Sequence, residues 1–394
     1  MNIIILTSEK FPLGGAASNR IISYSRGLIE LGCDVNVLVT RPADRITDKL
    51  KNKQKGVFEN IKYSYLHNKT NWPKYFIIRV YTIYLSYFLL LFKLLKININ
   101  KKNIIYLIST DNYLVNIIIW FYSKIFSNKF YLILDEYPFF KRIDSRKFRI
   151  NGRLTNRFRF RLCDGMILIS DILIDYYKSL TSKKTRFLKI PILVEMDRFN
   201  NVEPKFKSCI NEKYIIYCGL EPKIDGIDLL LNAFSQIHKN YNFLKIIIVG
   251  DTHERVFENL KKLCIELNIS DKVNFTGLLS RNEIPEYLLS ASLLVLPRII
   301  TSNSISGFPT KLGEYLSTKK PVLVSNIGEI SNYLKDNESC FFVEPNNVND
   351  LKNKIIKIFD NYEFALDVGE KGYQICKNNF NYKIQSEKLF NFIK

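Results

Sequence analysis

The run Gly307-Phe-Pro-Thr-Lys-Leu-Gly-Glu-Tyr-Leu-Ser-Thr-Lys-Lys-Pro-Val-Leu-Val-Ser325 is the most informative stretch of the chain. It predicts a polar loop, a short helix and a buried strand, an order typical of α/β proteins with a parallel sheet. Pro309 suits the first helical position, because proline has no N–H group to leave unpaired there. The free N–H groups at this helix start could therefore face an anion such as a diphosphate.

Two side chains of the same run add ligand chemistry. Lys311 places a positive charge beside the helix start. Glu314, four residues after Thr310 on the same helical face, could accept hydrogen bonds from a pair of sugar hydroxyls. The combination suits a nucleotide sugar. A helix that serves only packing stays open as the alternative.

Lys213 to about Pro345 resembles the donor-binding domain of glycosyltransferase family 4, the retaining enzymes with the GT-B architecture. The resemblance rests on short motifs in a fixed order: Tyr217-Cys-Gly219, Asp225 to Phe234, Ile246 to Gly250, Val273 to Gly277, Leu294 to Arg298, Pro309 to Leu316 and Pro321-Val322. It implies an α/β fold with two Rossmann-like parallel-sheet domains that face each other across a cleft.

The pattern along the chain agrees with two such domains. Ile3 to Leu6 predicts a buried strand, and a loop with Gly14-Gly15 and a helix follow it. We expect an N-terminal domain over residues 1–199, which binds the acceptor and faces a membrane, and a C-terminal donor domain over residues 200–380. By the resemblance, a last helix over residues 381–394 packs back on the first domain.

Composition narrows the class of protein further. A chain of 394 residues with 47% hydrophobic residues is long enough for two buried cores. Its seven cysteines are scattered without a Cys-x-x-Cys pair, and Met1-Asn2 leads directly into a strand-like run, so we expect a reducing cytoplasm. The three histidines lie far apart in sequence, so we expect no metal site.

The positive charge is concentrated in the first half of the chain. Residues 1–200 contain 34 Lys and Arg against 15 Asp and Glu, whereas residues 201–394 contain 24 against 23. Charge confined to one domain indicates that this domain faces an anionic surface while the other binds a small ligand.

One source of this asymmetry is an apolar stretch without acidic residues. No Asp or Glu occurs from Ile61 through Thr110, and Tyr75 to Leu95 predicts an apolar helix flanked by lysines. Arg79 leaves only Val80 to Phe92 free of charge, short of the roughly 20 residues of a transmembrane span. We expect an interfacial helix; a core helix of the first domain and a membrane-inserted helix stay open.

The other source is Phe139 to Arg161, where basic residues alternate with phenylalanine. Such a pattern could bind anionic lipid headgroups or a nucleic-acid backbone. The neighbouring nucleotide-sugar domain and the lack of a nucleic-acid motif favour lipid, and a solvated basic face is the alternative. The residues expected to contact the membrane or the acceptor are Lys141, Arg142, Arg146, Lys147, Arg149, Arg153 and Arg157.

The sequence departs from the family at two places in the donor site. The usual Glu-x7-Glu pair would fall at Ser306 and Glu314, so only the second glutamate is present. The resemblance assigns Glu314 to the ribose hydroxyls and the missing glutamate to the transferred sugar. The family's phosphate-binding Arg and Lys align with Leu220 and Asp225, and Lys223, Lys311 and Arg298 are the candidates to replace them. A subset of the family with Gly-Phe-Pro-Thr-Lys-Leu-Gly-Glu-Tyr-Leu and Glu136-Tyr-Pro138 shows similar changes.

The donor-binding candidates combine these motifs with the first loop. Gly14 and Gly15 would let the loop backbone approach the donor phosphates, with help from Arg20, although a plain turn is the alternative. The full set is Gly14, Gly15, Arg20, Gly219, Lys223, Gly250, Leu279, Arg298, Ser306, Gly307, Phe308, Pro309, Thr310, Lys311 and Glu314.

Three carboxylates are the catalytic candidates. Asp111, Asp135 and Glu136 each follow a predicted strand and could orient the acceptor, although helix caps or solvated groups are the alternative. The resemblance implies a reaction with retention and without metal, in which the departing phosphate takes the acceptor proton. No cofactor is expected, since the substrate is a nucleotide sugar such as a UDP- or GDP-sugar.

We therefore expect a cytoplasmic glycosyltransferase, peripherally associated with the inner face of the plasma membrane. Its acceptor would be a lipid-linked saccharide in bacterial surface polysaccharide assembly, as for a capsule or lipopolysaccharide. A nucleotide-sugar epimerase of the same fold is one alternative. A non-enzymatic basic protein that binds membrane or nucleic acid is the other.

Overall fold

The computed structural model describes residues 1–44, 51–110, 112–137, 159–200, 202–203, 213–219, 224–250 and 254–394. These residues form two compact units. The first contains Met1–Leu193 and Tyr382–Lys394, and the second contains Val194–Asn381. The observed division lies a few residues before the expected boundary at residue 199. The C-terminal helix belongs to the first unit.

The first unit is built on an eight-stranded sheet in the order β3-β4-β2-β1-β5-β6-β7-β8. Only β3 is antiparallel to its neighbour. Continuous apolar runs such as Ile3 to Leu6 form the central strands because both faces of a parallel sheet are covered. The strands are β1 (Asn2–Thr7), β2 (Asp34–Val39), β3 (Lys55–Phe58), β4 (Ile61–Tyr65), β5 (Ile104–Ser109), β6 (Lys129–Leu134), β7 (Gly165–Leu168) and β8 (Arg186–Lys189).

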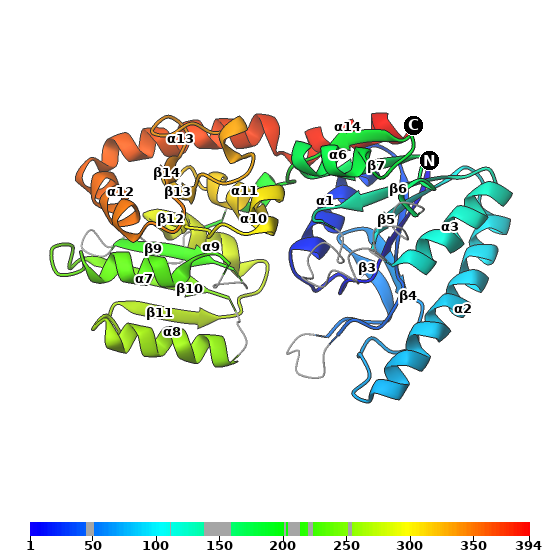
Figure 1. Ribbon diagram of the computed structural model, residues 1–394, viewed down its shortest axis with the longest axis horizontal. Helices are drawn as coiled ribbons and strands as arrows, with labels where there is room; N and C mark the ends of the chain where they lie inside the picture. The colour runs from blue at the N-terminus through cyan, green and yellow to red at the C-terminus, as the bar shows by residue number, and fades with distance from the viewer. Residues whose placement is uncertain are drawn as a thin grey trace. The chain divides into compact units, whose positions relative to one another are not determined.

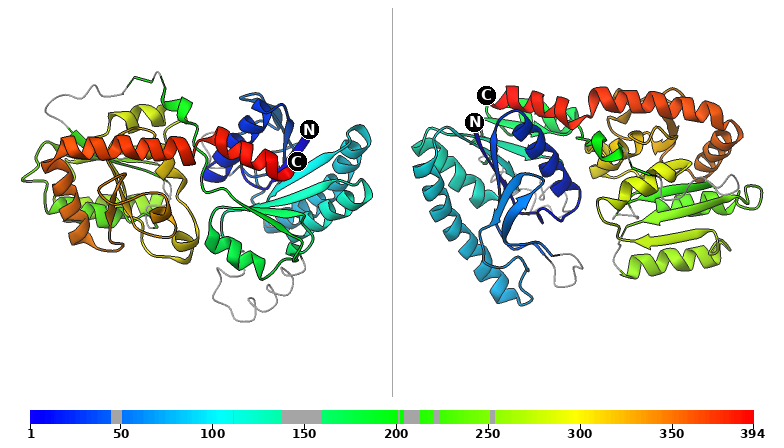
Figure 2. Two further views of the ribbon diagram at one scale, coloured as in Figure 1. Left: turned by 90° about the horizontal axis from the view of Figure 1, so that it is seen from above. Right: turned by 180° about the vertical axis from the view of Figure 1, so that it is seen from behind.

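Helices lie on both faces of this sheet (Figure 1). They are α1 (Ala16–Glu30), α2 (Phe76–Asn100), α3 (Tyr113–Ile125), α6 (Asp171–Lys178) and α14 (Tyr382–Ile393). Ile3 and Ile5 of β1 share a core cluster with residues of α1 and α14, whereas Ile4 points to the opposite face, towards α2. Figure 2 shows α14 beside α1, where the two helices pack together.

The second unit has a six-stranded parallel sheet in the order β11-β10-β9-β12-β13-β14. Its strands are β9 (Lys213–Cys218), β10 (Leu244–Val249), β11 (Val273–Gly277), β12 (Leu293–Leu296), β13 (Val322–Ser325) and β14 (Phe341–Val343). Its helices are α7 (Ile227–Ser235), α8 (Glu254–Glu266), α9 (Glu283–Ser290), α10 (Ser302–Ser306), α11 (Thr310–Leu316), α12 (Val348–Asp360) and α13 (Tyr362–Asn379), with short 3-10 turns at Met196–Phe199 and Ile330–Asn332. The prediction of two Rossmann-like parallel sheets is confirmed.

Two helix predictions need correction. The apolar helix expected over residues 75–95 continues to Asn100, because no glycine or proline interrupts the run. Pro309 is the residue before α11 rather than its first residue, since its backbone is extended with ψ 115°.

Gly27 tests how α14 docks on the first unit. A Cβ at this position of α1 would overlap Oγ and Cβ of Ser386 in α14. We therefore expect Gly27→Ala to lower the free energy of unfolding by about 1–3 kcal/mol, although alanine favours helix. Trp72 and Trp120 are the two tryptophans of the chain and both belong to the first unit, so their fluorescence in urea follows this unit. Adding Ser386→Gly should restore part of the loss; a destabilisation unaffected by that change would contradict the packing.

Candidate functional site

The candidate site lies at the carboxyl ends of β9 and β12. From β9 the chain proceeds to β10 and β11 on one side of the sheet and to β12, β13 and β14 on the other. Open α/β sheets bind ligands outside the strand ends at such a switch in strand order. Gly219 directly follows β9, Arg298 follows β12, and α11 carries Lys311 and Glu314. Four donor-binding candidates therefore belong to the elements around this edge of the second sheet.

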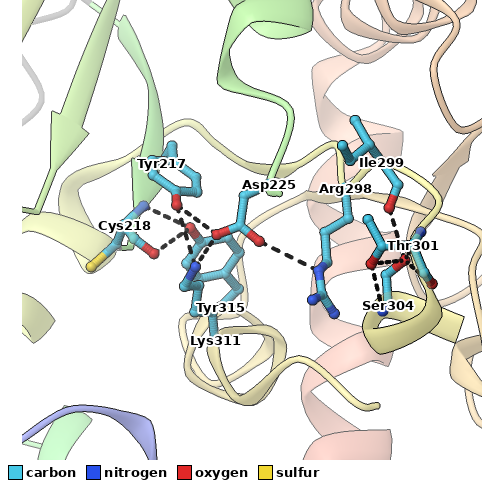
Figure 3. Close-up of polar contacts among 9 residues, drawn as sticks. All are labelled: Tyr217, Cys218, Asp225, Arg298, Ile299, Thr301, Ser304, Lys311 and Tyr315. Atoms are coloured by element: carbon cyan, nitrogen blue, oxygen red, sulfur yellow. Dashed lines mark hydrogen bonds and ion pairs between the residues drawn. The ribbon is translucent and has the colours of Figure 1, made fainter. Parts of the chain in front are cut away.

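Asp225 organises the polar side chains at this edge (Figure 3). Its Oδ2 atom accepts a hydrogen bond of 2.6 Å from the Tyr217 hydroxyl and another from Lys311 Nζ. Its Oδ1 atom lies 3.4 Å from Arg298 Nε, as an ion pair. The Asp225 residue is 3% exposed, whereas the side chains of Lys311 and Arg298 are 24% and 14% exposed. The net charge of these three groups is +1, and the two cationic side chains are partly exposed.

The absence of a side chain at Gly219 makes this arrangement possible. A Cβ there would overlap Lys311 Nζ and the Tyr217 hydroxyl. Gly250, at the end of β10, has φ 138°, and a Cβ on it would overlap the carbonyl oxygen of Gly219. Both predicted glycines therefore let backbone and charged groups approach closely at the strand ends.

The hydroxyl and thiol groups beneath the site stay protonated. Burial raises the pKa of Tyr217, and the adjacent Asp225 carboxylate raises it further. Burial also raises the pKa of Tyr315, whose hydroxyl accepts a 2.8 Å hydrogen bond from the Cys218 backbone N–H. Burial raises the pKa of the Cys218 thiol to about 12, so this cysteine is not a thiolate nucleophile at neutral pH.

Glu314 is held by an arginine that the sequence analysis did not select. Arg198 Nη1 donates to Glu314 Oε1 at 2.8 Å, and Arg198 Nη2 donates to the carbonyl oxygen of Arg281 at 2.6 Å. Arg281 in turn forms a 2.7 Å ion pair with Glu195. Among the described residues Glu314 has no second hydrogen-bond partner, and its side chain is 23% exposed. In the sequence, Pro191 to Phe199 resembles the segment by which the family crosses into the second domain, and this is the one signal that could have drawn attention to Arg198.

Two donor-binding candidates lie in the core instead. Ser306 is fully buried and its hydroxyl donates to the Ser302 carbonyl oxygen at 2.9 Å. Phe308 is 4% exposed and packs against Tyr333 and Phe380. These side chains do not face a ligand in this structure, so sugar recognition by the Ser306 side chain is not supported.

The start of α11 is a weaker anion site than its sequence indicates. The helix is only seven residues long, so fewer peptide dipoles align there. Leu312 N–H donates to the Pro309 carbonyl oxygen, which uses one N–H group of the first turn. Gly307 links α10 to α11 and Thr310 begins α11. Positive charge at this edge therefore comes chiefly from side chains.

Arg20 and Asp135 bind each other in the first unit. Arg20 is 5% exposed and donates to the carbonyl oxygens of Pro191 and Ile190, each at 2.8 Å. Its Nε atom lies 3.2 Å from Asp135 Oδ1. Both side chains thus have structural partners, which argues against the donor role of Arg20 and the acceptor role of Asp135. Tyr24 adds a further partner to Arg20, through its hydroxyl.

The remaining candidates are placed as follows. Gly14 packs against Ser18 and the Lys10 carbonyl oxygen, and Gly15 precedes α1. Glu136 is exposed after β6, and its carbonyl oxygen accepts from the Tyr177 hydroxyl. Leu279 is half-buried in the loop after β11. Asp111, Lys223, Lys141, Arg142, Arg146, Lys147, Arg149, Arg153 and Arg157 lie outside the described residues. Within the described part of the chain, no three His, Cys, Asp or Glu side chains gather as metal ligands.

Comparison with known proteins supports the resemblance of the second unit. Residues 201–375 match the family model described as Glycosyl transferases group 1. An uncharacterized glycosyltransferase of Methanocaldococcus jannaschii is 26% identical over 152 residues, 39% of this chain and 40% of that protein. The GDP-mannose-dependent alpha-(1-6)-phosphatidylinositol monomannoside mannosyltransferase of Mycobacterium tuberculosis is 22% identical over 214 residues, 52% of this chain and 55% of that protein. The chain spans about half the length of the curated relatives it matches.

The fold comparison covers the whole chain. Sucrose-phosphate synthase from Thermosynechococcus elongatus has a TM-score of 0.77 at 16% identity, over 99% of this chain and 98% of that one. The chain therefore has the GT-B fold, as the sequence motifs predicted.

Asp225→Asn tests the charge balance at the strand ends. The amide leaves Lys311 and Arg298 close together without a counter-charge, and breaking a buried ion pair from one side is strongly destabilising. We expect the free energy of unfolding to fall by about 2 kcal/mol or more, measured by circular dichroism in urea. The matched control is Asp367→Asn, which removes the exposed Lys371–Asp367 pair on α13 and should cost about 0.5 kcal/mol or less. Equal effects of the two substitutions would disprove the structural role of Asp225.

Proposed function

We propose that the protein is a glycosyltransferase that moves a sugar from a nucleotide-sugar donor to a lipid-linked saccharide. The proposal rests on one observation above the others. Glu314, Lys311 and Arg298 lie at the switch in strand order of a unit that matches a glycosyltransferase family model. A carboxylate and two cations at such a strand edge are the groups that a nucleoside diphosphate requires.

The donor would bind with its ribose at Glu314 and its diphosphate near Lys311. Arg198 occupies one carboxylate oxygen of Glu314 and so fixes the orientation of the group. The other oxygen would then accept from a ribose hydroxyl. Lys311 and Arg298 would turn partly from Asp225 towards the phosphates, since a diphosphate offers more negative charge than one carboxylate. Asp225 would hold both cations ready until the donor arrives.

The proposed reaction retains the anomeric configuration and needs no metal. The bond between the anomeric carbon and the phosphate oxygen breaks, and the acceptor oxygen bonds to the same face of the sugar. The departing phosphate takes the acceptor proton. Cationic side chains fixed before the bond breaks would stabilise the charge that develops on the phosphate. Glu136, which is exposed after β6, is the candidate of the described region that would orient the acceptor.

The acceptor is proposed from the similarity to known proteins and from the charge distribution. The mycobacterial relative acts, by its name, on a phosphatidylinositol monomannoside, which is a lipid-borne saccharide. The first half of this chain carries nearly all of the positive charge excess, as suits a unit that faces anionic lipid. We place the protein at the cytoplasmic face of a bacterial plasma membrane, in the assembly of a surface polysaccharide.

Donor binding by Glu314 can be tested directly. We expect the protein to bind one member of a panel of UDP- and GDP-sugars in isothermal titration calorimetry. Glu314→Gln should weaken that binding about tenfold or more, because hydrogen bonds to charged groups contribute more than neutral ones. The matched control is Glu370→Gln, which removes an exposed carboxylate on α13 and should leave binding unchanged.

Three results would count against the proposal. Neither binding nor hydrolysis of any sugar nucleotide would remove the enzymatic function. Equal affinities of the Glu314→Gln variant and the unchanged protein would remove the assigned ribose contact. Conversion of the donor without an acceptor would indicate an epimerase of the same fold.

A further inference from the structure

Helix α2 buries several polar side chains and exposes most of its apolar ones. The residues of α2 that are buried follow one another at intervals of four, and three of the five are polar: Thr82, Ser86, Leu90, Leu94 and Asn98. By contrast, Ile77 is 79% exposed and Phe88 is 56% exposed. A helix on the surface of a soluble domain shows the opposite arrangement. The outer face of α2 therefore lacks the apolar surroundings that its composition requires.

The apolar surface continues onto the neighbouring helix α3. The two helices pack side by side, with Tyr122 of α3 donating to the Leu91 carbonyl oxygen of α2 at 2.8 Å. Phe121 and Ile125 of α3 are also exposed. We call the exposed apolar side chains of α2 and α3 the α2–α3 apolar face; Figure 1 shows both helices on the same face of the first sheet. A contiguous apolar surface that spans two helices marks a place of interaction.

The charges around this face indicate what it contacts. Residues 61–134 contain ten Lys and Arg, against Asp111 as the only acidic residue. Lys93 and Lys96 are exposed side chains of α2. Together with Lys101 they border a pocket of about 260 Å³, which Ile4 and Leu38 of the sheet also line. Lys101 pairs with Asp34, whereas Lys93 and Lys96 have no acidic partner among the described residues. Apolar residues bordered by unpaired lysines complement a membrane surface with anionic headgroups.

The contacts of α2 decide between lying on a membrane and crossing it. By length and composition the helix passes as a candidate membrane span, and 22% of its most apolar window is buried. However, its polar side chains bind the first unit: Ser86 Oγ lies 2.7 Å from His67 Nε2, and Asn98 donates to the Tyr106 hydroxyl at 2.8 Å. A span would separate these groups from their partners. The alternative of a core helix does not agree with the structure, because only five of the 25 residues of α2 are buried.

We propose that the α2–α3 apolar face binds the surface of a bilayer that contains anionic lipids, with α2 lying in the plane of the interface. Its exposed Phe, Tyr and Ile side chains enter the boundary between headgroups and acyl chains. The lysines along α2 meet the headgroup phosphates. The inference rests on the proposed function in one respect, because a lipid-borne acceptor gives the enzyme a reason to stay at this surface.

Vesicle binding by the full chain tests the proposal. We expect the protein to co-sediment with vesicles of phosphatidylcholine and phosphatidylglycerol, and more weakly with phosphatidylcholine alone. The double variant Ile77→Ser/Phe88→Ser should bind the mixed vesicles at least about tenfold more weakly, because two apolar side chains no longer leave water on binding. The matched control is Ile265→Ser/Ile300→Ser, which alters two exposed isoleucines of the second unit and should bind as the unchanged protein does.

A charge variant separates the two contributions. Lys93→Gln/Lys96→Gln should weaken binding to the mixed vesicles and reduce its dependence on salt, while binding to phosphatidylcholine alone stays the same. Circular dichroism of each variant confirms that the fold is intact.

The proposal is overturned by any of three outcomes. In the first, the unchanged protein fails to bind mixed vesicles. In the second, the Ile77→Ser/Phe88→Ser variant binds them equally well, which would assign binding to another segment. In the third, the face forms a dimer that this variant abolishes. Nucleotide binding measured in parallel keeps the two proposals separate. Vesicle binding without nucleotide binding contradicts the enzymatic function alone, and the reverse contradicts only the membrane face.

Discussion

The buried carboxylate of Asp225 is the constraint on which the polar edge of the second unit depends. A carboxylate that is 3% exposed needs charged partners, and Lys311 and Arg298 provide them from α11 and the end of β12. The approach of Lys311 in turn requires Gly219 to lack a side chain. The buried charge of Asp225 thus determines that glycine follows β9 and fixes the positions of the Lys311 and Arg298 side chains. The resulting site holds its positive charge in place but partly neutralised.

Glu314 is constrained in a similar way by Arg198. The arginine comes from the short turn after the crossing into the second unit, and its other nitrogen donates to the backbone next to α9. Three separate elements therefore fix one carboxylate, which leaves it little freedom before a ligand binds. Such prior orientation reduces the conformational entropy that the Glu314 side chain would lose when a ribose binds. In the first unit the pairing of Arg20 with Asp135 has a different consequence. Both side chains already have structural partners, so neither is held ready for a ligand.

The two units differ in where their apolar side chains lie. In the second unit apolar side chains such as Phe308 lie inside, and the polar groups gather at the strand ends. In the first unit, α2 buries the polar side chains Thr82, Ser86 and Asn98 beside two leucines and leaves most of its aromatic and aliphatic side chains outside. Hydrogen bonds to His67 and Tyr106 satisfy the inner polar groups, so this inversion costs the unit little by itself. The exposed side of α2 has no partner in the described part of the chain, which is the observation behind the proposed contact with an anionic bilayer.

The sequence by itself determined the two parallel sheets, because runs such as Ile3 to Leu6 and the glycines after them are local signals of strand and turn. It also predicted that Lys311 and Glu314 lie on one short helix, as the structure has them. Only the tertiary structure decided the partners of these groups: Arg198 is 116 positions from Glu314, and Asp225 is 86 from Lys311. Which strand ends meet depends on strand order, and no local periodicity encodes that. The tertiary structure also decided the burial of Ser306 in α10 and the exposure of most apolar side chains of α2, because the neighbouring elements determine which face of a helix is buried.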